Sequence, residues 1–303
     1  MEQIKDEVVK ARPHLSKQSI ATYTSILKNL YIKVFHDDKF DITKFNDVEK
    51  ILNFLKELEP NKRKTILSAL VILTDKKDYR ELMLSDITEY NKEQSKQVMS
   101  NEQDENWICT EDIKKLMNGI EKNVKLLYKK EEHTSSDFQQ IQSYIILCLL
   151  GGTYIPPRRS KDYVDFKIKN INKDTDNYLV KNKMIFNSYK TAKTYGQQEI
   201  LVPPTLLKIL RKWIKINPTD YLLFDSNFAK LTNVKLNQRL NKLFGNRKIS
   251  VNQLRHTYLS DKYQDSIQLN RDIAADMAAM GSSSKQERIY IKSTKGKTKS
   301  NSV

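Results

Sequence analysis

The sequence has few of the residues that build disulfide frameworks and metal centres. Only two cysteines, Cys109 and Cys148, occur among 303 residues, and they do not form a CxxC pair. Their number and spacing argue against a disulfide framework or a zinc site, and they fit a reducing compartment. The four histidines lie far apart and form no pattern of metal ligands. We therefore predict no structural metal site.

Long apolar runs are also missing. No stretch approaches the roughly 18 residues that span a bilayer, and the longest, residues 144–150, is typical of a buried helix. The first ten residues, MEQIKDEVVK, are charged and contain no signal region, so neither secretion nor membrane insertion is expected. Apolar residues make up 39% and charged residues 30%, which suits a globular protein of about two domains.

The chain is strongly basic, and the excess is concentrated. Its net charge is +16, yet residues 1–100 contain 18 Lys and Arg against 16 Asp and Glu. Residues 190–260 contain 13 basic and 3 acidic residues. A general enrichment in lysine would spread evenly, whereas a local excess favours a polyanionic partner, because Lys and Arg neutralise phosphates. Nucleic acid is the partner that this pattern indicates.

Residues 1–90 are predicted to form a small helical domain. Ser16 is expected to cap a helix over residues 17–35, whose apolar positions follow the three-four spacing of one helical face. These positions are Ile20, Tyr23, Leu27, Leu30, Tyr31 and Val34. A second helix is expected to end before Pro60, and a third to follow it.

Three cations, Lys62, Arg63 and Lys64, lie in the first turn of that third helix. Cations at a helix N-terminus oppose the helix dipole. The conflict is explained if these side chains bind phosphate, and a solvated helix face is the alternative.

Residues 91–107 are polar and are predicted to be a linker. The larger domain, residues 108–291, begins with helical patterns and then changes period. Short strands are expected at residues 178–180, 184–189 and 199–202, and helical patterns resume at Pro204 and continue to about Gly281. Residues 292–303 are basic and are predicted to form a mobile tail.

Five segments carry groups suited to phosphate chemistry. In order they are TYIPPRRSKDYVDFKI with Arg158 and Arg159; the hairpin MIFNSYKTAKTYGQQEILVPP with Lys190 at a strand end and Lys193 in the turn; ISVNQLRHTYLSDKY with Arg255 and His256; MAAMGSSS, ended by Gly281; and KQERIYIK with Tyr290.

In this order and spacing the chain resembles the tyrosine recombinase (phage integrase) family, with LRHT as the most specific match. The resemblance is weak over residues 12–90 and more specific over residues 108–291. It implies a mainly α fold with a small antiparallel β-sheet, in which a helical core-binding domain precedes a mixed catalytic domain. The PPRR variant and the abundance of Lys, Asn and Ile resemble divergent recombinases of viruses and mobile elements.

The resemblance implies two arginines that bind the phosphoryl oxygens, whose fork-shaped donors match two oxygens at once. Arg255 is the second. Arg159 is preferred over Arg158 as the first, because Asp162 then falls where the family has an acidic residue. One member of the pair is expected at the surface, and Arg158 is included among the DNA-binding candidates.

The resemblance further makes Lys190 the general acid, with Lys193 as the alternative or as a DNA contact, and Tyr290 the nucleophile. The energy of the broken bond is kept in a 3′-phosphotyrosyl link, so no ATP, metal or other cofactor is implied. An ordinary solvated turn lysine is the alternative for either lysine, and a packing residue is the alternative for Tyr290.

Two positions depart from the family. Asn252 stands where a histidine often precedes the second arginine, and Ser282 stands where a histidine or tryptophan often follows the glycine. Both stay candidate catalytic residues, because their side chains can donate hydrogen bonds to a phosphoryl oxygen, but neither exchanges a proton near neutral pH as histidine does. His256 is a candidate DNA contact, although in the family that position is more often a buried structural residue.

The implied partners are duplex DNA and further copies of the chain, as a dimer or tetramer on DNA, and no membrane. The implied location is an intracellular, reducing compartment, whether cytoplasm, nucleus or viral factory. Two alternatives stay open: relaxation of DNA like that of a type IB topoisomerase, and DNA binding without catalysis, which the departures at Asn252 and Ser282 motivate. RNA binding is a weaker third.

Overall fold

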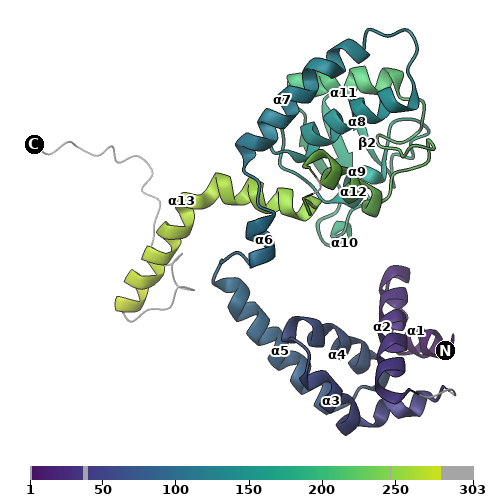
Figure 1. Cartoon of the computed structure of the whole chain (residues 1–303), viewed down its shortest axis with the longest axis vertical. Helices are drawn as coiled ribbons and strands as arrows, with labels where there is room; N and C mark the ends of the chain where they lie inside the picture. Colours follow the sequence, from purple (N-terminus) through teal and green to yellow (C-terminus); the bar gives the residue numbers. More distant parts are fainter. Residues whose placement is uncertain (1, 37–39, 246, 281–303) are drawn as a thin grey trace, which may run out of the picture. The chain divides into compact units, whose positions relative to one another are not determined.

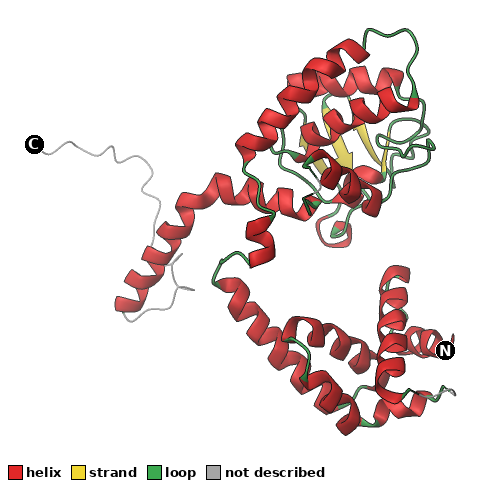
Figure 2. Cartoon of the chain, in the orientation of Figure 1, coloured by secondary structure: helices red, strands yellow, loops and turns green. Residues whose placement is uncertain are grey.

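The computed structural model describes residues 2–36, 40–245 and 247–280. The chain divides into two compact units, Met1–Met99 and Ser100–Val303, each with its own buried core. Figure 1 follows the chain along its sequence, and Figure 2 shows that helices dominate and that the one small sheet belongs to the second unit. None of the described helices has the length and apolarity that crossing a membrane requires. The tail predicted at residues 292–303 lies outside the described residues.

The first unit is built from five α-helices and one 3₁₀ helix over its described residues. They are α1 (Glu2–Ala11), α2 (Lys17–Phe35), η1 (Ile42–Asn46), α3 (Val48–Lys56), α4 (Pro60–Thr74) and α5 (Lys77–Ser95). The predicted helix over residues 17–35 is confirmed, and so is its cap, because the Ser19 amide donates to Oγ of Ser16 across 3.1 Å. Its apolar face packs into the core through Leu27, Leu30 and Tyr31.

The polar segment over residues 91–107 contains helical structure. Helix α5 continues to Ser95, and a short helix, α6 (Asn101–Glu105), follows. Ser100 and Gln103 form a capping box, in which each side chain accepts a hydrogen bond from the other residue's amide. The division between the two units falls between Met99 and Ser100.

The second unit is built around the buried helix α8 (Ser135–Leu150). After α6, its other described helices are α7 (Thr110–Leu127), α9 (Ser160–Val164), α10 (Ala192–Tyr195), α11 (Pro204–Ile216), α12 (Asn233–Leu243) and α13 (Val251–Ala279). The prediction of a buried helix at residues 144–150 is confirmed, since every side chain there is at most 3% exposed. This helix, α8, contributes to a single apolar core that also includes Trp213 and Phe224, whose rings stack.

The sheet has four strands in the order β1 (Phe166–Lys167), β2 (Asn177–Val180), β3 (Lys183–Phe186) and β4 (Gln198–Leu201). The expected antiparallel pairing holds for β2–β3 and β3–β4, but β1 pairs with β2 in parallel, so the sheet is mixed. Strand β3 ends three residues before the predicted Tyr189. The amides of Asn187 and Ser188 donate to Oδ1 of Asn177 (2.9 and 2.8 Å), which removes them from the strand ladder.

The helical pattern predicted from Pro204 onward is interrupted. Helix α11 ends at Ile216, and residues 217–232 are irregular. Pro218 explains the break, because a proline disfavours helical geometry in the residue before it, and Asn217 is extended. Helix α13 is bent at Tyr263, whose backbone dihedral angles are not helical. Gly281, the predicted end of this helix, lies outside the described residues.

Candidate active site

Three arginines from two parts of the second unit line one pocket. Arg158 and Arg159 lie immediately before α9, and Arg255 lies in the first turns of α13. The pocket has a volume of about 270 Å³, and the carboxylate of Asp162 is also in its wall. The structure therefore brings together the two arginines that the sequence predicted as a pair and the acidic residue expected beside them.

The glycine before this segment fixes the approach to α13. Gly152 has a φ of +72°, a conformation that residues with a side chain rarely adopt. A Cβ at this position would lie 2.6 Å from Cδ2 of Tyr258, on the same turn of α13 as Arg255. Gly152 therefore permits the chain that leads to Arg158 and Arg159 to pass close against α13.

The guanidinium of Arg158 is held by two hydrogen bonds and by contacts with two aromatic rings. Its Nε donates to Oδ2 of Asp162 (2.7 Å), and its Nη1 donates to Oε1 of Gln198 (2.8 Å). Its guanidinium lies over the Phe186 ring, 4.0 Å from the centroid, and near the Tyr189 ring. The side chain is 15% exposed, so the expectation that one arginine of the pair would be a surface residue is wrong for Arg158. Two of its donor atoms, Nε and Nη1, are therefore used within the fold.

The side chain of Arg159 is half-buried and, among the described residues, makes no hydrogen bond or ion pair. Its charge acts on its neighbours. Burial lowers the pKa of Arg255, the charges of Arg159 and Arg158 lower it further, and Asp162 opposes them. Three guanidinium groups thus share one carboxylate, and an anion with several oxygens would compensate the excess charge.

Asp162 is almost fully buried, with 2% of its surface exposed. One carboxylate oxygen accepts from Arg158, and Oδ1 has no hydrogen-bond partner among the described residues. Burial raises the pKa of Asp162, against the opposing charges of Arg158, Arg159 and Arg255. The carboxylate ties α9 to the pocket and leaves one oxygen for a further donor.

The two candidate lysines lie in the segment that joins β3 to β4. Strand β3 ends before Lys190, and Lys193 belongs to α10 instead of an open turn, which corrects the predicted hairpin. Both lysines are exposed, and neither lines the pocket. Tyr189 and Thr191, on either side of Lys190, do line it.

The start of α13 places three candidates. Asn252 is exposed, and its Oδ1 accepts a hydrogen bond from Nη1 of Arg255 across 3.3 Å. His256 is exposed, so the interpretation of this position as a buried structural residue is wrong. Leu254 and Thr257 of the LRHT motif are instead buried, and the Thr257 hydroxyl donates to the Ile108 carbonyl (3.0 Å). Ser282 and Tyr290 lie outside the described residues.

The cations of α4 separate into different environments. Lys62 is exposed. Arg63 donates from Nε and Nη2 to the two oxygens of the buried Asp86 (2.8 and 2.6 Å), so it fits neither predicted role, phosphate binding or a solvated face. Lys64 is half-buried over the Tyr90 ring, and burial lowers its pKa.

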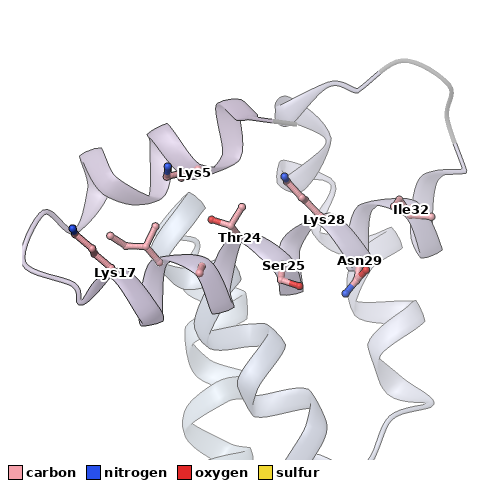
Figure 3. Close-up of a pocket in the computed structure, with 9 residues that line it drawn as sticks. Lys5, Lys17, Thr24, Ser25, Lys28, Asn29 and Ile32 are labelled. Carbon is pink, nitrogen blue, oxygen red and sulfur yellow. The ribbon is translucent and has the colours of Figure 1, made fainter. Parts of the chain in front are cut away.

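A groove between α1 and α2 was not predicted. Figure 3 shows Lys5 on α1, with Lys17, Thr24 and Lys28 on α2. Thr24 is 8% exposed, and its hydroxyl has no hydrogen-bond partner among the described residues. Three lysines along one groove give this face a positive charge that favours an anionic partner. The helical spacing of Lys17, Thr24 and Lys28 was visible in the sequence, but the packing of α1 against α2 was not.

Other residues of the arginine pocket also escaped the sequence. Gln198 lies opposite Phe186 in the β3–β4 register, which places it beside Arg158. Tyr195, which is 67% exposed, lines the pocket from α10. Neither residue is marked by a motif, and only the strand register would have revealed Gln198.

No protein-family model and no characterised protein sequence matches the chain. Among solved structures, it is similar to a lambda integrase dimer bound to a COC′ core site, with 11% identity and a TM-score of 0.44 over 88% of this chain and 70% of that chain. It is similar to a lambda integrase(75–356) dimer bound to a COC′ core site, with 12% identity and a TM-score of 0.44 over 100% and 99%.

It is also similar to the XerH site-specific recombinase bound to difH substrate in a pre-cleavage complex. The identity is 17% and the TM-score 0.41, over 96% of this chain and 92% of that chain. At 11 to 17% identity these likenesses concern the fold and assign no role to any residue.

Proposed function

We propose that the chain is a site-specific DNA recombinase or integrase of the tyrosine recombinase family, which cuts and rejoins DNA through a covalent bond to Tyr290. The observation that carries the proposal is the pocket in which Arg159 and Arg255 lie beside the buried Asp162. Attack on a phosphodiester adds negative charge to the phosphoryl oxygens. Guanidinium groups that the fold holds in position before the reaction stabilise this charge. The stabilisation is greatest where few carboxylates of the protein neutralise the guanidinium charge.

The reaction balances without an external energy source. The Tyr290 hydroxyl passes its proton to a water molecule as its oxygen attacks phosphorus, and the bond from phosphorus to the 5′ oxygen breaks. Lys190 gives a proton to the departing 5′ oxygen. The products are a 3′-phosphotyrosyl link and a free 5′ hydroxyl, and attack by the 5′ hydroxyl of another strand reverses these steps and releases Tyr290.

The pocket also suggests a division of roles between the neighbouring arginines. Among the described residues the Arg159 guanidinium donates to no partner, whereas Nε and Nη1 of Arg158 donate to Asp162 and Gln198. We assign Arg159 to the phosphate and Arg158 to the support of the pocket. Asn252 is proposed to donate a hydrogen bond to a phosphoryl oxygen, with Ser282 proposed beside Tyr290, and the exposed Lys193 and His256 are proposed to contact the DNA.

The first unit is proposed to hold the duplex outside the reacting phosphate. Lys62 is exposed, and the groove with Lys5, Lys17 and Lys28 adds three further cations. Phosphate contacts of this kind position a protein on DNA without reading its sequence. Joining two cut sites requires more than one active chain, so the working form is proposed to be a homo-oligomer on DNA.

The decisive experiment uses nicked suicide duplexes taken from the DNA that flanks the coding sequence. Loss of the short fragment beside the nick prevents rejoining, so a covalent adduct accumulates and is seen on a denaturing gel. The wild type should form the adduct, and Tyr290→Phe should bind the same duplex without forming it. A covalent adduct with Tyr290→Phe would contradict the assignment.

A second candidate is a DNA-binding protein of the same fold that does not cleave. Asn252 favours it, because its amide accepts from Arg255 and cannot exchange a proton near neutral pH. This candidate predicts tight, salt-sensitive binding with no adduct from the wild type. Relaxation of a supercoiled plasmid without site preference would instead indicate activity like that of a type IB topoisomerase.

A further inference from the structure

Helix α11 carries a row of cations on its outer face. Its inner face is buried through Leu206, Leu210 and Trp213. The outer face has four exposed basic residues, and the helix contains no acidic residue. These residues, here called the α11 stripe, are Lys208, Arg211, Lys212 and Lys215, which line one surface groove with Pro204 and Leu207.

The charges of the α11 stripe are not neutralised within the fold. Among the described residues, none of the four forms an ion pair. Arg211 donates to the carbonyl of the exposed Lys181 (3.2 Å), and Lys212 lies 6.0 Å from the centroid of the Tyr128 ring. Like charges three and four residues apart on one helix face repel and destabilise the helix. A bound polyanion would remove that repulsion.

The composition of the groove indicates whether its polyanionic partner is an acidic protein or a nucleic acid. The core of a protein–protein interface is depleted in lysine and depends on buried aromatic or aliphatic anchors. Among the residues that line this groove, only Pro204 and the partly buried Leu207 have apolar side chains. A nucleic-acid backbone needs charge along a line, and the stripe extends for roughly 10 Å along the helix, from the 1.5 Å rise per residue.

We propose that the α11 stripe binds the sugar–phosphate backbone of a DNA duplex as a second contact, separate from the arginine pocket. The two sites share no lining residue, and Figure 1 draws α11 and α10 at separate ends of the second unit. The inference rests on the proposed function only in taking DNA as the ligand, and it requires no strand cleavage. Lysine predominates, so the contact should not depend on base sequence.

The first test measures how binding of the full chain to a 30-base-pair duplex of random sequence depends on salt. The variant is Lys208→Gln/Lys212→Gln/Lys215→Gln. Its control is Lys114→Gln/Lys115→Gln/Lys122→Gln, which removes the same charge from exposed positions of α7. The slope of log affinity against log salt should fall by about 2 to 3 in the α11 variant, at roughly 0.9 per lost phosphate contact. Equal slopes in the two variants would overturn the proposal.

The second test locates the contact by lysine acetylation and mass spectrometry. The duplex should reduce acetylation of Lys208, Lys212 and Lys215 at least threefold and leave Lys114 and Lys122 unchanged. Equal protection at both sets would overturn the proposal. So would protection of the α11 stripe by polyglutamate but not by the duplex, since the occupant would then be an acidic protein.

The same footprint in Arg159→Ala/Arg255→Ala separates the two proposals. Protection of the α11 stripe should persist, and its loss would show that the stripe is no separate site. If the wild type forms no covalent adduct but the stripe is protected, the recombinase proposal fails and this inference stands.

Discussion

Arg158 and Asp162 form a buried pair one helical turn apart, in which Nε of Arg158 lies 2.7 Å from Oδ2 of Asp162. The same guanidinium reaches Gln198 on β4, so one side chain joins the start of α9 to the sheet. The neighbouring Arg159 makes no such contact among the described residues. Adjacent residues of the same type therefore differ in what their loss should do.

Arg158→Ala should destabilise the protein by about 3 kcal/mol, because it leaves the carboxylate of Asp162 buried and unpaired. Arg159→Ala should change stability by about 0.5 kcal/mol or less, since it removes repulsion from Arg255 and breaks no side-chain hydrogen bond to a described residue. Arg158→Lys should fall between them, because an ammonium cannot serve Asp162 and Gln198 in the same geometry. Urea unfolding measures all three, and equal losses for the two alanine variants would contradict the division of roles.

A second prediction concerns acid stability at the start of α8. Lys130, which donates from Nζ (2.8 Å), and then the Thr134 amide lower the pKa of Asp137 to about 2. The folded state thus binds the proton more weakly than the unfolded chain, whose pKa is near 3.8. The stabilisation is present above pH 4 and is lost as the pH falls toward 2.

Unfolding of the wild type and of Asp137→Asn, compared between pH 7 and pH 2, tests this assignment. The difference between their free energies of unfolding should be largest above pH 4 and should shrink by pH 2. A difference that stays constant over this range would assign the effect of the substitution to the capping geometry alone.

Gly152 supports a third prediction. Gly152→Ala should destabilise by about 1 to 3 kcal/mol, because alanine disfavours a φ of +72° and its Cβ would meet the Tyr258 ring. Gly119→Ala is the matched control in α7, where an added Cβ would have no atom within 4 Å apart from its chain neighbours and the helix's own backbone, and it should stabilise by roughly 0.5 to 1 kcal/mol. The double variant Gly152→Ala/Tyr258→Ala should recover the part of the loss that comes from the clash. If the losses of stability in Gly152→Ala and Tyr258→Ala simply added up in the double variant, the whole loss in Gly152→Ala would come from the backbone conformation.

Local signals predicted the helices well. The cap at Ser16, the apolar spacing that follows it and the proline at position 60 are all encoded within a few residues. The capping box at Ser100 was equally local, but the polar composition of residues 91–107 concealed it. The mixed sheet required β1, whose two residues are too few for any periodicity.

The candidate site divides in the same way. The placement of Arg159 and Arg255 in one pocket was predicted from motifs that resemble those of a known family. The support of Arg158 by Gln198 depends on the register of β3 and β4, and the pairing of Arg63 with Asp86 depends on how α4 packs on α5. Such contacts arise from tertiary packing, and sequence spacing does not contain them.

The choice between Lys190 and Lys193 supports the last prediction. Neither lysine lines the pocket, but Lys190 lies between two residues that do, Tyr189 and Thr191, whereas Lys193 is an exposed residue of α10. If Lys190 is the general acid, Lys190→Ala should slow cleavage on the order of 100-fold or more. Replacing the departing 5′ oxygen with sulfur should restore the rate to within about tenfold of the wild type, since a thiolate leaves without needing that proton.

Lys193→Ala should lose less than about tenfold with either substrate, as expected of a phosphate contact. The readout is the initial rate of adduct formation on suicide duplexes that differ only in that bridging atom. If the sulfur substrate restored the cleavage rate of Lys193→Ala and not that of Lys190→Ala, Lys193 of α10 would be the general acid. A Lys190→Ala variant that is slow on both substrates would make Lys190 a residue that positions the phosphate, because removing the need for a proton would not have helped.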